Sequence, residues 1–558
     1  MFSQFFSRKI LIFLLSAVIF LQGCVMLPQI PVAVQPEPVI QPVFAAPIDH
    51  QPAPPPVYGD FTLRYDPNSP LNPITAMSRD NILLSSLLYE SLFVLDGNLN
   101  LVSVLAYDWY TEDGITHIIE IVPDIAMNDG TTLTANDVVY SLRRAMATGR
   151  FVNRLQIISS VSAIDYYTIS IVLRSANNRL PVLLDVPIIK EGSSEMDVPP
   201  GSGPYLFLYG SSGAMLIRFP RHRYFPNLPI PSISLVYSDD GRATELFDDG
   251  VLSLIWDDPG GVFEFRLNRF HESRFYDTMQ MQFVGFNTRL PALRNPDVRS
   301  AIGHSIERNF IATEIMPGQA LPAPLAISPA YRLYNIGWEL RGIDPFHEMS
   351  ALLVRAGMAA PADHSFASDD DAVPVVVFQT DDYNFLMYSA DSGNPESFVI
   401  DFIVNSENSF KVRAAHRIAE TLRNTGINVV VRELPWESFL TALRTGDFDM
   451  FYGETLISPD FDFSPLLLPN GSLNFGGTGS DSFLPLIQNF LSASDDYSEA
   501  EAARVLVNEI RLTAPFSPIL YKRHAIYTPI GAVQHATPSQ SGIFFGFADW
   551  IIDRTMLG

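Results

Sequence analysis

The sequence predicts an α/β protein, because strand-like and helix-like segments alternate along most of its 558 residues. Three segments show this best. Residues 61–65 alternate as a strand, and residues 83–92 place leucines on one face of a helix. Residues 411–423 give a second helix with an apolar stripe. Such alternation is typical of a sheet covered by helices.

The alternation continues through the first half of the chain. Residues 115–122 are predicted to form a strand, and residues 138–145 a helix. The helix start is marked by Thr134, a good N-cap, and by Asp137, whose charge suits the first turn. Two further strands are expected within residues 157–173.

The rest of the chain carries equally local signals. The segment 201–205, rich in glycine, is a sharp turn before another strand. Asn295 is an N-cap with proline at the next position, so a helix is expected over 298–311. The helix at 411–423 ends before a glycine and is followed by a strand at 428–432.

The N-terminus resembles that of an exported lipoprotein. Arg8 and Lys9 precede an apolar run of roughly 12 residues, which is shorter than the roughly 20 that span a bilayer. The run ends at Cys24, the only cysteine of the chain. Its setting resembles a bacterial lipobox, so we expect residues 1–23 to be a signal peptide and Cys24 to be lipidated. A cleaved signal that happens to contain a cysteine is the alternative.

The composition indicates how the rest of the chain is organised. Residues 24–56 are rich in proline and are expected to be a semi-rigid linker. The remaining chain is long for a single core and suggests two or three lobes. The net charge of −25, or −27 without the signal peptide, argues against a nucleic-acid partner. No later apolar stretch is long enough to span a membrane.

Several segments in order resemble the dipeptide and oligopeptide-binding family of solute receptors for ABC importers. They are SPLNPITAMSRDNILLSSLLYESLFVLDGN (69–98), NDGTTLTANDVVYSLRRA (128–145), GSGPYLF (201–207), GFNTRLPALRNPDVRSAIGHSIERNFI (285–311), ALLVRAG (351–357) and VRELPWESFLTALRTGDFDMF (431–451). Each segment alone is weak evidence, but their order and spacing cover almost the whole mature chain.

The resemblance implies a two-lobed α/β fold of the periplasmic-binding-protein kind (class II), with an extra subdomain, that closes on a central cleft by a hinge. It also implies a division of the chain. Lobe I would hold residues 57–95, 200–284 and 515–558, the extra subdomain 96–199, and lobe II 285–514.

The function implied is capture of oligopeptides for an ABC permease and ATPase complex, without cofactor or catalysis. The receptor would be a monomer, held by its lipid anchor at the outer face of the cytoplasmic membrane. Such receptors grip a peptide through its backbone, as if adding a strand. In lobe I the matching residues are Thr75, Ala76 and Met77, for which a plain surface loop is the alternative.

In lobe II the resemblance is less regular. Many relatives have Gly-Trp and then an aspartate that pairs with the ligand's amino group, whereas this chain has Tyr452, Gly453 and Glu454. A buried ammonium still needs a partner. Glu454 is the first candidate and Asp460 the second, although either residue could cap a turn instead.

Other residues are weaker candidates for the cleft. Asn474 lies in a glycine-rich loop that resembles a family loop near the cleft mouth. Trp436 and Trp256, together with Tyr452, offer flat apolar surface, but the tryptophans are as well explained by packing.

Other functions have less support. The sequence lacks the Gly-x-Ser-x-Gly and His-Glu-x-x-His motifs of common hydrolases. The histidines are scattered, which disfavours a bare-metal site, and a calcium site in the acidic run 368–371 lacks EF-hand spacing. Related receptors serve nickel complexes, sugars or haem, and a peptide sensor without its own permease is also compatible with the sequence.

Overall fold

The computed structural model describes residues 61–557, except for 212, 239–241, 259, 262–265, 335–344, 357, 360–376, 380–383, 389–395 and 398. Cys24, the proline-rich linker and the acidic run 368–371 therefore lie outside the described residues. Within the described ranges, no helix is both long enough and apolar enough to cross a membrane.

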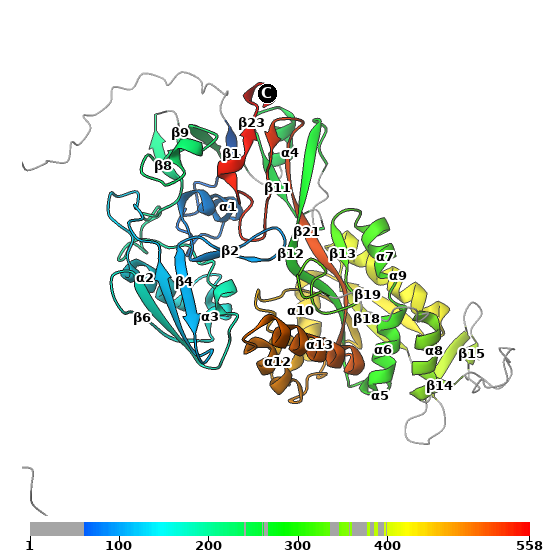
Figure 1. Cartoon of the computed structure of the whole chain (residues 1–558). Coiled ribbons are helices and arrows are strands. Elements are labelled where there is room, and N and C mark those ends of the chain that lie inside the picture. The colour runs from blue at the N-terminus through cyan, green and yellow to red at the C-terminus, as the bar shows by residue number, and fades with distance from the viewer. Residues whose placement is uncertain are drawn as a thin grey trace, which may run out of the picture. The chain divides into compact units, whose positions relative to one another are not determined.

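The first sheet has four strands in the order β1-β10-β9-β8 (Figure 1). Its strands are β1 (Thr62–Arg64), β8 (Tyr205–Gly210), β9 (Gly213–Arg218) and β10 (Ser232–Val236). β1 pairs with β10 in parallel, so residues 62–64 join strands from more than 100 residues later in the sequence. α1 (Arg79–Leu88) contributes leucines to the same core, which also takes Phe544 and Trp550 from the C-terminal segment.

A second four-stranded sheet, β4-β5-β7-β6, has a core of its own. Its strands are β4 (Ala106–Thr111), β5 (Thr116–Ile121), β6 (Ile158–Ala163) and β7 (Thr168–Leu173). α2 (Ala135–Ala147) packs on it, followed by α3 (Val152–Leu155). Before the sheet, β2 (Phe93–Leu95) and β3 (Leu101–Ser103) form a hairpin.

The largest sheet follows the order β11-β21-β12-β20-β18-β19, with β13 paired to β21. It comprises β11 (Ile255–Asp257), β12 (His271–Phe286), β13 (Ala320–Pro322), β18 (Ile400–Asn405), β19 (Val429–Leu434), β20 (Met450–Leu456) and β21 (Phe516–Pro529). Its parallel part is β18 with β19 and β20, joined by the helices α9 (Ser409–Asn424) and α10 (Trp436–Thr445).

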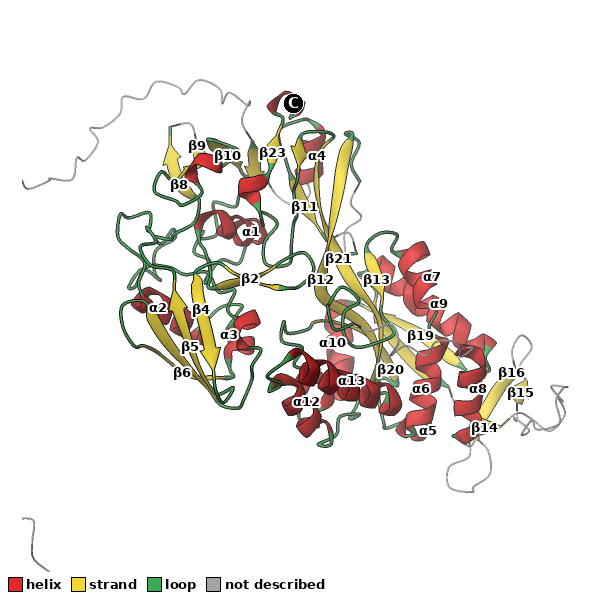
Figure 2. Ribbon diagram, viewed as in Figure 1, coloured by secondary structure: helices red, strands yellow, loops and turns green. Residues whose placement is uncertain are grey.

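Further helices and strands surround this sheet (Figure 2). The helices are α5 (Pro291–Arg294), α6 (Pro296–Ser305), α7 (Arg308–Phe310), α8 (Pro345–Arg355), α11 (Ser464–Leu467), α12 (Phe483–Leu491) and α13 (Asp496–Thr513). Outside it lie α4 (Ala243–Asp248), the pair β22 (Val533–Gln534) and β23 (Ile551–Ile552), and β14 to β17 (Met358–Ala359, Val377–Gln379, Asn384–Tyr388, Glu396–Ser397).

The two longest strands, β12 and β21, connect the regions. They pair antiparallel from His271↔Pro529 to Gly285↔Phe516, with an irregular register between Asp277 and Met281. At one end of the pair, Tyr276 and Ile526 are part of the same hydrophobic core as α1. The other end belongs to the cores around β18 and β20. The chain therefore passes between these cores along a pair of adjacent strands (Figure 1).

Most local predictions are confirmed. Helix α2 begins with the expected capping box, in which the Thr134 amide donates to Asp137 at 2.9 Å. α9 and β19 also form where expected. Two helix ends were wrong. The helix predicted to include the leucines up to Leu92 ends at Leu88, because Tyr89 is extended. The helix after Asn295 ends at Ser305, because Ile306 is extended and Arg308 turns back to donate to the Gly303 carbonyl at 2.9 Å.

Candidate ligand-binding site

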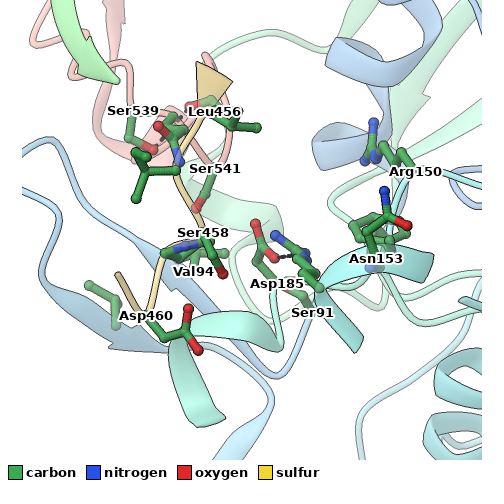
Figure 3. A pocket seen from close by; sticks show the side chains of 18 of the residues that line it. Ser91, Val94, Arg150, Asn153, Asp185, Leu456, Ser458, Asp460, Ser539 and Ser541 are labelled. Carbon is green, nitrogen blue, oxygen red and sulfur yellow. Dashed lines mark hydrogen bonds and ion pairs between the residues drawn. The ribbon is translucent and has the colours of Figure 1, made fainter. Parts of the chain in front are cut away.

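A cavity of about 1730 Å³ lies among four parts of the fold. Pockets that bind drug-sized ligands have roughly 300–1,000 Å³, so this one has room for a larger ligand. Its walls come from α1 and the loop after it, from the β2–β3 hairpin and the region of α3, from the loop after β20, and from residues 539–549. Figure 3 shows this arrangement, with Leu456, Ser458 and Asp460 on one side and Arg150 and Asn153 on the other.

The loop after β20 supplies a wall with acidic groups. The carboxylate of Asp460, a residue that is 3% exposed, accepts hydrogen bonds from the side chain of Asn177 at 2.9 Å and from the amide of Asp462 at 3.2 Å. Asp462 also lines the cavity, and burial together with the neighbouring charge of Asp460 raises its pKa. The two carboxylates have polar donors but no basic partner among the described residues.

Arg179 links this wall to the segment that follows β7 of the second four-stranded sheet. Its guanidinium is 8% exposed, and its Nε donates to the Asp460 carbonyl at 2.9 Å. Its Nη2 donates to the Tyr331 hydroxyl at 2.8 Å, and its Nη1 pairs with Glu499. This group, called the Arg179 clasp below, holds the Asp460 loop against the segment that follows β7.

The C-terminal wall is fixed by bonds to strands. The Ser541 hydroxyl accepts a hydrogen bond from the Leu95 amide at 2.8 Å, which attaches the loop to β2. The side chain of Gln540 accepts from the Met279 amide in the irregular part of β12. Residues 539–549 therefore contact both the hairpin and the long connecting strands.

The opposite wall is rich in arginine. Arg150, Arg154 and Arg174 line the cavity there, with Asp185 as the one acidic residue between β3 and Pro187. Arg154 pairs with Asp185. A separate buried group lies at the end of α1, where Glu90 binds Arg223 at 2.6 Å and His222 at 3.4 Å.

The sequence indicated none of these arginines as site residues. They belong to no recognisable motif, and they come together only because the ends of α2, α3 and β7 meet in the folded second sheet region. The only available signal was the glycine before Arg150, which marks a turn (Gly149, φ 80°).

Of the eight residues expected to contact the ligand, the structure brings only Asp460 to the cavity. Tyr452 and Gly453 lie inside the sheet. The Tyr452 hydroxyl donates to Gln282 at 2.8 Å, and the side chain is fully buried. A Cβ added at Gly453 would lie 2.6 Å from the Phe283 ring, so this glycine is needed for packing between β20 and β12.

Glu454 is placed outside the cavity, and its charge is already matched. Its carboxylate lies 3.0 Å from Lys411 Nζ and 3.8 Å from Lys522 Nζ, and it accepts from Gln282 at 2.7 Å. Burial acts to raise the pKa of Glu454, but the two lysines outweigh it and hold the pKa below its usual value. A ligand ammonium is therefore not needed to neutralise this carboxylate.

The segment Thr75 to Met77 forms a turn that does not line the cavity. The amides of Thr75 and Ala76 donate to the Asn72 carbonyl at 3.2 and 2.8 Å. The Met77 amide faces Ser69 Oγ at 3.4 Å, and its side chain is 86% exposed. These three amides have partners within the turn, so they are not available to a peptide backbone in this conformation.

Asn474 and the two tryptophans have structural contacts of their own. The Asn474 side chain donates to the Leu468 carbonyl at 3.2 Å and accepts from the Thr478 amide at 3.0 Å, so it holds its own loop. Trp436 stacks on Phe439 at the start of α10. Trp256 donates to the Tyr276 hydroxyl at 2.5 Å and lies under Arg79. None of the three lines the cavity.

In the described part of the chain, no three His, Cys, Asp or Glu side chains are grouped so that they could hold a metal ion. The histidine on the cavity wall is His222, which is engaged by Glu90.

Residues 100–475 match the model of the bacterial extracellular solute-binding proteins, family 5 (middle). The chain belongs to this family. Its members are solute-binding proteins, which classes the chain with binding proteins and not with enzymes.

Among curated proteins, the glutathione-binding protein GsiB of Escherichia coli (strain K12) is 24% identical over 283 residues, which is 48% of this chain and 54% of GsiB. The chain thus spans about half the length of the curated relatives it matches.

Solved structures show the same fold. The oligopeptide-binding protein AppA from Bacillus subtilis, in complex with a nonapeptide, has a TM-score of 0.57 and 17% identity over 89% of this chain and 97% of AppA. NikZ from Campylobacter jejuni, in complex with Ni(L-His), has a TM-score of 0.62 and 17% identity over 88% of this chain and 99% of NikZ. These likenesses confirm the predicted two-lobed α/β fold.

Proposed function

We propose that the chain captures oligopeptides outside the cytoplasm and delivers them to an ABC importer. The observation that carries this proposal is the cavity of about 1730 Å³, which is lined by several separate parts of the fold and by both apolar and polar or charged side chains. In a ligand site the apolar surface supplies affinity and the polar groups fix the ligand's orientation. The size favours an extended ligand over a single amino acid or ion.

The acidic wall supports a ligand with an amino group. Asp460 and Asp462 lie two residues apart in the cavity, and their repulsion and burial raise the pKa of Asp462. A bound ammonium would relieve both effects, because it supplies the cation that the pair lacks. We assign the ligand amine to these two residues in place of Glu454, whose charge Lys411 and Lys522 already match.

The relatives are compatible with this proposal. GsiB is named as a glutathione-binding protein, and glutathione is itself a short peptide. AppA was crystallised with a nonapeptide. NikZ was crystallised with a nickel–histidine complex, so a metal chelate is the second candidate ligand.

Ligand identity is tested by thermal unfolding of the full chain with peptides of two to ten residues, with glutathione and with Ni(L-His). A ligand that binds only the native state raises its stability, by about 2.7 kcal/mol at a concentration of one hundred times the Kd. The proposal predicts a higher melting temperature with one or more peptides. A rise with Ni(L-His) and none with any peptide would refute it.

Cys24 is proposed to carry the lipid anchor, because it is the only cysteine and follows a charged start and a short apolar run. Mass spectrometry of the N-terminal peptide should find acyl chains on Cys24, and Cys24→Ser should release the protein from membranes. An unmodified Cys24 in the membrane-bound protein would contradict this assignment.

A further inference from the structure

Residues 177–179, called the latch below, connect two predicted parts of the chain. They follow β7 and belong to residues 96–199, the predicted extra subdomain. Their side chains donate hydrogen bonds to residues that all lie within 285–514, the predicted lobe II. The latch therefore joins two parts that the predicted hinge closure would bring together.

Asn177 bonds to the carboxylate of Asp460, one of the two that we assign to the ligand amine. The Asn177 side chain is 0% exposed, and its Nδ2 donates to Asp460 Oδ2 at 2.9 Å. Its Oδ1 accepts from the Arg179 amide at 2.8 Å, which fixes the way the carboxamide faces. Asn177 does not line the cavity, so its route to a ligand is through Asp460.

The backbone at Asp460 is held from the same side. Its carbonyl accepts from Nε of Arg179 at 2.9 Å. The next residue, Phe461, has a φ of 57°, a left-handed conformation that is unfavourable for a residue with a side chain. Such a conformation persists where its surroundings fix it. Here the Phe461 ring lies 4.6 Å from the ring of Tyr331, whose hydroxyl accepts from Arg179.

The Asp460 carboxylate keeps bonding capacity for a ligand. Its Oδ2 accepts from Asn177, and its Oδ1 accepts from the Asp462 amide at 3.2 Å. A carboxylate offers about four acceptor sites, so both oxygens can accept a further hydrogen bond. Because Asp460 lines the cavity, an ammonium there would meet a carboxylate whose orientation the latch already sets.

We propose that Asn177 and Arg179 are positioning residues for the ligand amine, and that the amine site at Asp460 is complete only while the latch is engaged. This inference rests on the proposed function for the ligand class and on the predicted division of the chain. Because latch and amine share one aspartate, engagement of the latch favours the amine, and the bound amine favours engagement by the same free energy.

Two variants remove the contacts with Asp460. Asn177→Ser loses the donor to the carboxylate, whereas the serine hydroxyl can still accept from the Arg179 amide. Arg179→Lys keeps a cation for Glu499 but lacks the fork that reaches the Asp460 carbonyl at the same time.

Asn178→Ala is the matched control. The Asn178 side chain donates to the carbonyls of Ser492 and Ala493 at 2.7 and 3.1 Å. The variant therefore weakens the same latch and leaves the bonds to Asp460 in place.

Calorimetry compares a free-amine peptide with its N-acetylated form on the full chain, with putrescine and free histidine as non-peptide amines. In Asn177→Ser the ratio of the two peptide affinities is expected to fall about two- to tenfold, the factor for ordering one side chain on binding. Arg179→Lys should lower the same ratio. In Asn178→Ala both peptides should weaken by one factor, so the ratio stays as in the wild type.

Amide hydrogen exchange of residues 176–180 reports engagement of the latch, because the Asn178 amide donates to the Leu491 carbonyl at 2.8 Å. At saturation, the free-amine peptide is expected to slow exchange there more than the N-acetylated peptide does. Equal slowing by the two peptides would refute the coupling between amine and latch.

The outcomes separate this inference from the proposed function. If peptides bind and Asn177→Ser changes the affinity ratio no more than Asn178→Ala does, the positioning role is refuted and peptide capture stands. If only a non-peptide amine binds, and Asn177→Ser weakens it more than Asn178→Ala does, peptide capture is refuted and the positioning role stands. Equal weakening of that amine, or no binding of any amine, would refute both.

Discussion

Replacing Arg179 by methionine removes the centre of the Arg179 clasp with little change of volume. Three interactions are lost: the ion pair with Glu499, and the hydrogen bonds to Tyr331 and to the Asp460 carbonyl. The pair is buried, with 8% and 9% of the two side chains exposed. Breaking a buried pair from one side costs about 3–5 kcal/mol, mostly because the partner charge stays buried.

The expected cost of Arg179→Met lies at the lower end of that range. Glu499 keeps a second partner in Arg332, so its carboxylate is not left without a cation. We therefore expect a loss of about 3 kcal/mol in the free energy of unfolding. Arg332→Met is the matched control, since Arg332 binds the same carboxylate but is 43% exposed. An exposed pair contributes at most about 1 kcal/mol.

Urea unfolding of the full chain, followed by tryptophan fluorescence, measures both variants. A shift in midpoint at constant slope reports a change in stability. The Arg179 clasp also supports the cavity wall at Asp460, so Arg179→Met should speed ligand dissociation. If Arg179→Met costs no more than Arg332→Met, the buried pair does not stabilise the fold and the reasoning fails.

Four further predictions concern three carboxylates. Glu454→Gln should cost about 3 kcal/mol of stability, because Lys411 loses its buried partner, whereas Lys522 keeps Asp258 at 2.6 Å. The variant should affect the binding of free-amine and of N-acetylated peptides equally. A selective loss of free-amine binding would show that Glu454 binds the amine after all. Asp462→Asn should weaken the binding of free-amine peptides more than the binding of N-acetylated ones, as measured by calorimetry. An equal effect on both would refute the amine assignment. In the wild type the same affinity should fall as the pH drops through the raised pKa of Asp462, because the protonated form cannot pair with an ammonium. Asp257, whose pKa burial and Asp258 raise to about 7, binds a proton more readily in the folded chain than in the unfolded one. Its contribution to stability is therefore complete below about pH 4 and is lost as the pH rises through 7. In thermal unfolding, the wild type and Asp257→Asn should differ little below about pH 4, and the wild type should become less stable than the variant as the pH rises to 7 and stay so above it.

The elements predictable from the sequence are those whose signals are local. The capping box at Thr134 and Asp137 and the apolar stripe of α9 depend on residues within a few positions of one another. The end of α6 was not predictable, because it depends on Arg308, which also donates to the Pro518 carbonyl 210 residues away. The family could be predicted because many weak local matches occur in one order.

The cavity could not be predicted in the same way. Glu454 looked like a free carboxylate in the sequence, and only the meeting of α9 with β21 brings Lys411 and Lys522 to it. Nothing near Tyr452 in the sequence says which of its faces packs against Gln282, because that is set by the register of β20 on β12.

Ligand release from the native protein tests the central claim most directly. The full chain, isolated without denaturation, should carry a fraction of its ligand, which acid unfolding sets free for mass spectrometry. The account predicts peptides of mixed sequence with a free amino end, and predicts that Asp462→Asn retains fewer of them. Recovery of a metal chelate or a sugar in place of peptides would contradict it.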